Sequence, residues 1–170
     1  MLFDASAFLH VGIAGIVDAT SASASFATST GDMLEVTACA GGAFRLRMGP
    51  RTRPDYGLLV GRARSLSTVQ REPGMWAIAN DDAELTLGGS PCVLRLAWKG
   101  QSLLESTTDR LASGGTRLPA VGRAPRGGLW VAAFALDSGV PVYGFGEKFG
   151  TLDKRGELVH SQVEDAQSVN

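Results

Sequence analysis

The residues most suited to chemistry lie near the carboxyl end, where glycines alternate with aromatic and charged residues over 142–156. Gly144, Gly146 and Gly150 are spaced almost like a dinucleotide-binding loop. That pattern requires its third glycine at position 149, which is Phe149 here. The strand-to-helix pattern that surrounds such a loop is also missing from the sequence. The segment therefore does not predict nucleotide binding.

The same segment suits either a structural corner or a sugar site. Closely spaced glycines let the backbone bend sharply, and Tyr143, Phe145 and Phe149 can anchor such a bend. The charged residues that can pair with one another are Glu147, Lys148, Asp153, Lys154 and Arg155. Sugars are held by planar apolar contacts and by carboxylate hydrogen bonds to hydroxyls. From the residues alone we favour the structural corner.

Short β-strands are the elements predicted to position this segment. Leu34, Val36 and Ala38 fall on one face of a predicted strand over 33–40. A second strand over 43–48 follows a glycine pair, as in a β-hairpin. Further strands are predicted at Leu58–Val60, Trp76–Ala79, Glu84–Leu87, Val93–Trp98 and from Leu103 onward.

The rest of the chain adds a long apolar run and a patternless stretch. Residues 129–136 predict a central strand that is buried on both faces, and residues 113–128 predict an exposed loop. No long window keeps a helical period. Many short strands without helices predict an all-β fold, an antiparallel β-sandwich that spans residues 1–170 as a single domain.

Charge and hydropathy exclude several classes of partner. Sixteen basic and seventeen acidic residues give a net charge of −1, so we expect no nucleic acid and no membrane as partner. Seven arginines lie between Arg45 and Arg71 with Asp55 as the only acid, and a solvated strand face is the favoured interpretation. No segment has the roughly 20 apolar residues of a membrane span, and we expect a cytoplasmic protein.

The cysteines and histidines do not predict a metal site. Cys39 and Cys92 are the only cysteines, and their apolar neighbours predict two buried thiols on strands. His10 lies in an apolar run near the amino terminus and His160 in the carboxyl-terminal stretch. Because no metal-ligand spacing is present, we expect no metal and no cofactor.

Three spaced elements of this region resemble a known family. They are Tyr143-Gly-Phe-Gly-Glu147-Lys-Phe-Gly150, Leu152-Asp153-Lys154-Arg155-Gly156 and Glu164-Asp165-Ala166. Together they are similar to the end of the amino-terminal domain of glycoside hydrolase family 31, which includes α-glucosidases and α-xylosidases. The chain departs from the family where Gln162-Val163 replaces the usual Trp-Asn, which affects the geometry expected of that loop.

The resemblance implies a galactose-mutarotase-like supersandwich that belongs to a larger retaining α-glycosidase. In such enzymes a (β/α)8 barrel carries both catalytic aspartates. We therefore expect an amino-terminal fragment that lacks the barrel, contains no catalytic residue and is inactive alone. Its implied partners are the barrel of the same parent chain and an α-linked sugar. An isolated domain would expose an apolar patch and self-associate.

The resemblance also implies roles for single residues. Asp165 matches the family residue that contacts substrate hydroxyls, and Glu164 beside it is a lesser candidate. The residues with an expected structural role are Tyr143, Gly144, Gly146, Glu147 and Arg155. A glutamate after two glycines can accept backbone N–H bonds, and Arg155 is its expected ion partner.

Two other functions are compatible with a β-sandwich. A free-standing carbohydrate-binding or interaction module would display aromatic residues on its surface. Trp76, Trp98 and Trp130 lie in strand-like runs, where a place in the core is commoner. A small mutarotase-like epimerase would need a histidine acid and a glutamate base, and neither His10 nor His160 looks positioned for that role.

Overall fold

The structure is a computed structural model that describes residues 8–49, 65–107, 119–126, 129–137, 139–143 and 152–155. It divides into two compact units, Met1–Ala135 and Leu136–Asn170. All strands of the described residues belong to the first unit. The expectation of a single domain over residues 1–170 stays a prediction.

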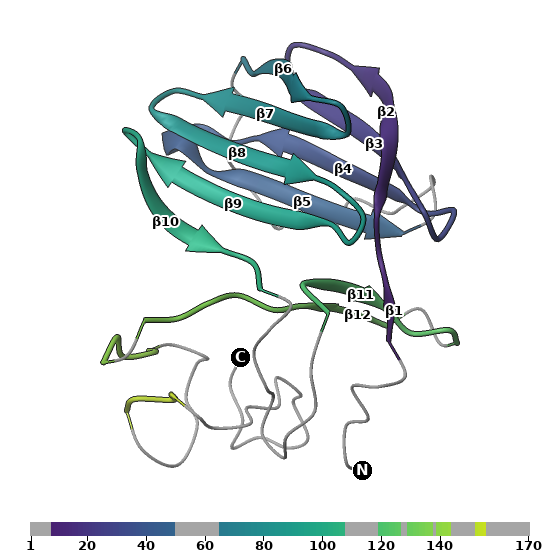
Figure 1. Ribbon diagram of the computed structural model, residues 1–170. Coiled ribbons are helices and arrows are strands. Elements are labelled where there is room, and N and C mark those ends of the chain that lie inside the picture. Colours follow the sequence, from purple (N-terminus) through teal and green to yellow (C-terminus); the bar gives the residue numbers. More distant parts are fainter. Residues whose placement is uncertain are drawn as a thin grey trace, which may run out of the picture. The chain divides into compact units, whose positions relative to one another are not determined.

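The first unit contains three antiparallel sheets in its described part (Figure 1). The four-stranded sheet has, in order, β2 (Ile13–Ala19), β3 (Ser23–Thr28), β4 (Met33–Ala38) and β5 (Phe44–Gly49). The five-stranded sheet has, in order, β10 (Gln101–Glu105), β9 (Val93–Trp98), β8 (Ala83–Gly88), β7 (Met75–Asn80) and β6 (Ser67–Glu72). The three-stranded sheet has, in order, β1 (Leu9–His10), β11 (Val121–Arg123) and β12 (Trp130–Ala132).

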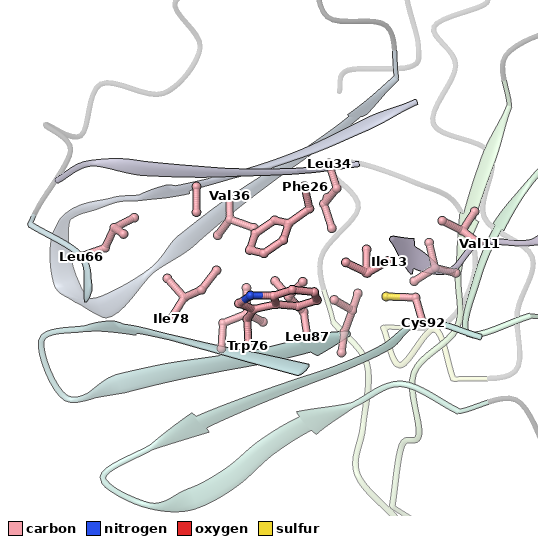
Figure 2. Close-up of a cluster of buried hydrophobic side chains, with 14 of the residues drawn as sticks. Val11, Ile13, Phe26, Leu34, Val36, Leu66, Trp76, Ile78, Leu87 and Cys92 are labelled. Atoms are coloured by element: carbon pink, nitrogen blue, oxygen red, sulfur yellow. The ribbon is translucent and has the colours of Figure 1, made fainter. Parts of the chain in front are cut away.

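The two larger sheets face each other across one hydrophobic core, so the chain folds as an antiparallel β-sandwich as predicted (Figure 2). Every second residue of β3 and β4 is buried, because successive strand side chains point to opposite faces. Phe26 from β3 meets Trp76 from β7 edge to face, with ring centroids 5.4 Å apart. Such a pair adds about 0.5–1.5 kcal/mol beyond the burial of its area.

A short 3-10 helix, η2 (Ala40–Gly42), joins β4 to β5 and is fixed to the opposite sheet. Asn80 at the end of β7 is buried, and its Nδ2 donates to the carbonyl oxygens of Cys39 and Ala43, both at 2.9 Å. Gly42 packs so closely on Trp98 that a Cβ there would lie 2.3 Å from the indole. These contacts set the spacing of the two sheets at this end.

The strands predicted over 33–40, 43–48, 76–79, 84–87 and 93–98 are confirmed within one or two residues at either end. The strand predicted from Leu103 onward is β10, which begins two residues earlier at Gln101, after a turn at Lys99 and Gly100. The strand predicted at Leu58–Val60 lies outside the described residues.

Three sequence predictions are wrong. Residues 129–136 do not form a buried central strand, because β12 covers only Trp130–Ala132 at the end of its sheet and Leu129 is 61% exposed. The stretch 113–128 is not simply an exposed loop, since β11 lies in it and Val121 is a core residue. Cys39 and Cys92 lie outside the strands rather than on them, and Cys39 is only partly buried, although Cys92 is buried as predicted and both are free thiols.

Candidate functional site

The carboxyl-terminal motif lies in the second unit, of which the structure describes 136–137, 139–143 and 152–155. Two of the predicted structural residues, Tyr143 and Arg155, lie in these ranges. The other predicted site residues lie outside the described residues: Gly144, Gly146, Glu147, Glu164 and Asp165.

A turn leads the chain into the motif. The Val140 N–H donates to the carbonyl oxygen of Asp137 at 3.3 Å, and Gly139 has a φ of +84°, which glycine adopts without steric cost. The two described stretches are then joined by the Lys154 N–H, which donates to the carbonyl oxygen of Val142 at 2.7 Å. Residues before and after the glycine-rich segment therefore lie side by side.

The side chain of Asp153 strengthens this junction. Its Oδ1 accepts the backbone N–H of Val142 at 2.8 Å and that of Arg155 at 3.0 Å. The bond from Val142, the bond from Arg155 and the nearby Arg155 charge together lower the pKa of the Asp153 carboxyl below its ordinary 3.8. The group is therefore a carboxylate at neutral pH and a poor proton donor.

Arg155 holds the other side of the junction. Its Nη1 donates to the carbonyl oxygen of Val140 at 2.6 Å, and its Nη2 lies 3.4 Å from the carbonyl oxygen of Leu136. We call the contacts that Asp153 and Arg155 make with residues 136–142 the Asp153–Arg155 clamp. The ion pair expected between Arg155 and Glu147 involves a residue outside the described ranges and stays a prediction.

The clamp joins described residues that lie before and after the segment 144–151. Tyr143, the last described residue before the segment, is 61% exposed, and Leu152, the first after it, is 81% exposed. The clamp has the chemistry of a structural contact, since Asp153 and Arg155 bind backbone groups. Asp153 was not among the predicted site residues, although an aspartate two residues before its N–H donor is the signature of an Asx turn.

The residues of the two alternative functions lie in the first unit, except His160, which belongs to the second unit and lies outside the described residues. His10 lies on β1, where it is exposed and pairs in register with Gly122. Trp76 is a core residue with 5% of its surface exposed, and Trp130 packs against the same core while partly buried. Trp98 is partly buried over Gly42. Trp76 is therefore not part of a surface platform for sugar rings.

An open hollow of about 380 Å³ lies over β7, β8 and β9, lined by residues that include Thr86 and Arg95. Of its acidic residues, Asp82 lies 3.6 Å from the Lys99 ammonium and Glu84 lies 2.9 Å from the Arg71 guanidinium. No aromatic ring is among its lining residues in the described part of the chain, so it offers no flat apolar surface for a sugar ring.

Comparison of the chain with protein-family models, with curated proteins and with solved structures finds no significant match. Within the described ranges, no three histidine, cysteine, aspartate or glutamate side chains gather as a metal site would require. The same ranges contain no helix long and apolar enough to cross a membrane.

Proposed function

We propose that this chain is the non-catalytic amino-terminal β-sandwich domain of a retaining α-glycosidase of glycoside hydrolase family 31. In this role it supports the catalytic (β/α)8 barrel and lends a loop to the sugar site. The two catalytic carboxylates of a retaining enzyme, about 5 Å apart, belong to the barrel. Its partners are the barrel and an α-linked sugar, and its place is the cytoplasm.

The observation that carries the proposal is the clamp within the motif. Asp153 and Arg155 belong to the second of the three elements that resemble the family, and both bind the backbone just before Tyr143. A loop whose ends are held in this way loses less conformational freedom when it binds a ligand or a neighbouring domain. This property suits a loop that must reach a sugar at a fixed place.

The proposed sugar contact is made by carboxylates after the clamp. Asp165 accepts hydrogen bonds from two substrate hydroxyls, and Glu164 beside it plays a lesser part. Charge-assisted hydrogen bonds of this kind contribute about 1.5–3 kcal/mol each. They improve binding and specificity, while the bond-breaking step uses the carboxylates of the barrel.

A free-standing carbohydrate-binding module is the alternative function. Its weakness is the burial of Trp76 in the core, since such modules display their aromatic residues. Titration of the chain with maltose and xylose oligomers, followed by tryptophan fluorescence, separates the two. Saturable quenching at modest sugar concentration would favour the module, and an unchanged spectrum favours the supporting domain.

The direct test joins this chain to the barrel of a family 31 enzyme that lacks its own amino-terminal domain. We expect hydrolysis of 4-nitrophenyl α-glucoside or α-xyloside by the fusion and none by the chain alone. Asp165→Asn in the fusion should lower kcat/KM by about tenfold to a hundredfold, and the matched Glu164→Gln by less. Turnover by the 170-residue chain alone would refute the proposal, as would equal activity of the barrel with and without it.

A further inference from the structure

The open hollow over β7, β8 and β9 lies on the outer face of the five-stranded sheet, on the three strands at its centre (Figure 1). Leu85 and Leu87 of β8 point into the core, so their neighbour Glu84 falls on the outer face. Ala79 of β7 and Ala97 of β9 both pair in register with Glu84. These alanines leave the space above the backbone unfilled, and the resulting volume of about 380 Å³ is within the range of small-molecule sites.

Two of the acidic residues around the hollow already have a cation beside them. Glu84 lies 2.9 Å from the Arg71 guanidinium, and Asp82 lies 3.6 Å from the Lys99 ammonium. Neither acid is therefore an uncompensated charge.

Two opposite charges among the lining residues remain uncompensated. They are Arg95 on β9 and Asp81 in the turn between β7 and β8, and both are exposed. In the part of the chain that the structure describes, neither side chain forms a hydrogen bond or an ion pair. Glu105 on β10 pairs in register with Arg95 and repels a ligand that is only an anion. The hollow therefore favours a ligand that carries a negative charge at one end and a positive charge at the other.

The strand register gives the length of that ligand. Arg95 pairs in register with Thr86 of β8, and Cβ atoms of such pairs are about 4.5–5.5 Å apart, so the guanidinium and the hydroxyl can donate to one carboxylate. From Thr86 to Ala83, where β8 begins, the strand rises roughly 10 Å, and Asp81 lies in the turn just before it. An extended peptide of about three residues has this length, at most about 10–11 Å.

We propose that the hollow binds a short extended peptide of about three residues with free ends. Its terminal carboxylate lies at Arg95 and Thr86, and its terminal ammonium lies at Asp81. Its backbone lies over Ala79 and Ala97, whose small side chains leave room for it. The inference rests on the first unit alone and does not depend on the proposed glycosidase function.

The test is an amide NMR titration of the full chain with trialanine. We expect saturable shift changes at the amides of residues 81–86 and 95–100, with a dissociation constant in the roughly millimolar range. Acetylation of the peptide removes its ammonium, and amidation removes its carboxylate. Each change should weaken binding about twofold to fivefold, because an exposed ion pair contributes only that much.

Two variants assign the ends of the peptide. Arg95→Gln should weaken the binding of trialanine and of acetylated trialanine about twofold to fivefold, and should leave the amidated peptide unaffected. Asp81→Asn should weaken trialanine and the amidated peptide and leave the acetylated peptide unaffected. Asparagine tolerates the φ of +54° at this position, so the turn is retained. The matched control is Arg126→Gln, which removes an exposed arginine outside the hollow.

Four results would each overturn the proposal. Acetate alone could bind at the same amides as tightly as trialanine, which would make the hollow a simple anion site. A peptide blocked at both ends could bind as well as the free one. Arg126→Gln could weaken binding as much as Arg95→Gln. The amides could show no saturable shift change in the parent chain, whose fold circular dichroism and the NMR spectrum verify.

Discussion

The carboxylate of Asp153 binds the Val142 and Arg155 amides although the side chain is exposed to solvent. Its position two residues before Arg155 makes the second bond local, whereas the bond from Val142 spans eleven residues. The bond from Val142 forms only if the chain at residue 153 comes back beside residue 142. Asp153 therefore links the described stretches 139–143 and 152–155, rather than acting only within its own turn.

Asp153→Ala should release the clamp. The folded-state pKa of this group is lowered, so its contribution is present above the ordinary pKa of 3.8 and is lost as pH falls through the folded-state value. We expect the amide proton shifts of Val142 and Arg155 to titrate with an apparent pKa below 3.8 in the parent chain. The same amides should lose hydrogen-exchange protection in the variant at neutral pH.

The control for this experiment is the amide of Lys154, whose hydrogen bond goes to a backbone carbonyl rather than to a carboxylate. Its shift should respond less to the titration of Asp153. Unchanged exchange at Val142 in Asp153→Ala would show that backbone bonds alone hold the junction and would contradict the role given to this side chain.

Cys92 and Cys39 should differ sharply in reactivity. Cys92 is 1% exposed, and burial raises its pKa to about 11, so it stays a protonated thiol at pH 8. Cys39 is only partly buried. Iodoacetamide at pH 8 should add one label to the native chain and two in denaturant, as counted by intact mass. Cys39→Ser should remove the native label, and a native chain that takes both labels equally would contradict this.

At the scale of the elements, the connection from β4 to β5 contains two glycines that are needed for different reasons, one for its backbone conformation and one also for close packing. Gly41 and Gly42 have φ values of +73° and +74°, but only at Gly42 does an added Cβ meet other atoms, at 2.3 Å from Trp98 and 3.2 Å from Ala83. Gly41→Ala should therefore cost about 1 kcal/mol for backbone strain, and Gly42→Ala about 2–4 kcal/mol because overpacking is added. Urea unfolding measures both, and equal losses would contradict the packing of η2 on β9.

The strands that the sequence predicts well are those with one buried face and one solvent-facing face. Leu34, Val36 and Ala38 alternate with polar residues, and this period is enough to identify β4 and its buried face. The prediction of a buried central strand over 129–136 fails because an apolar run does not determine whether other elements pack against both of its faces. Leu129 and Phe134 are 61% and 39% exposed beside a strand of three residues.

The candidate site was predictable in its residue types but not in its contacts. The charged residues of the motif were expected to pair with one another as side chains. That pairing stays a prediction, and the structure adds that Asp153 and Arg155 bind backbone groups of residues 136–142, which lie 11 to 19 residues earlier in the sequence. Composition cannot predict such bonds, because every residue offers the same carbonyl and almost every residue the same N–H.

At the scale of the first unit, the backbone of Val11 joins the three-stranded sheet to the sandwich. The Val11 N–H donates to the Val121 carbonyl at 3.0 Å, and its own carbonyl accepts the Cys92 N–H at 2.7 Å. Val11 and Val121 belong to the same core as Phe26 and Trp76. The small sheet therefore shares the core of the sandwich. Unfolding of the small sheet should destabilise the sandwich, and unfolding of the sandwich should destabilise the small sheet.

An ion pair makes a second link between these sheets. Arg123 at the end of β11 places Nε 2.9 Å from Oδ2 of Asp32, in the turn between β3 and β4, and its guanidinium lies 5.8 Å from the ring centre of Trp130. The side chains of Asp32 and Arg123 are 11% and 31% exposed. Water screens this pair less than a pair on the open surface.

Replacing Asp32→Ala and Arg123→Ala singly and together should give a coupling free energy of about 1–2 kcal/mol in urea unfolding. The matched control is the open pair Asp82–Lys99, with 57% and 66% exposure and a 3.6 Å separation. Its coupling should be about 0–0.5 kcal/mol, because water and side-chain freedom weaken exposed pairs. If both cycles give the same value, the Asp32–Arg123 pair contributes no more than an open surface pair, and the shared core alone holds the small sheet on the sandwich.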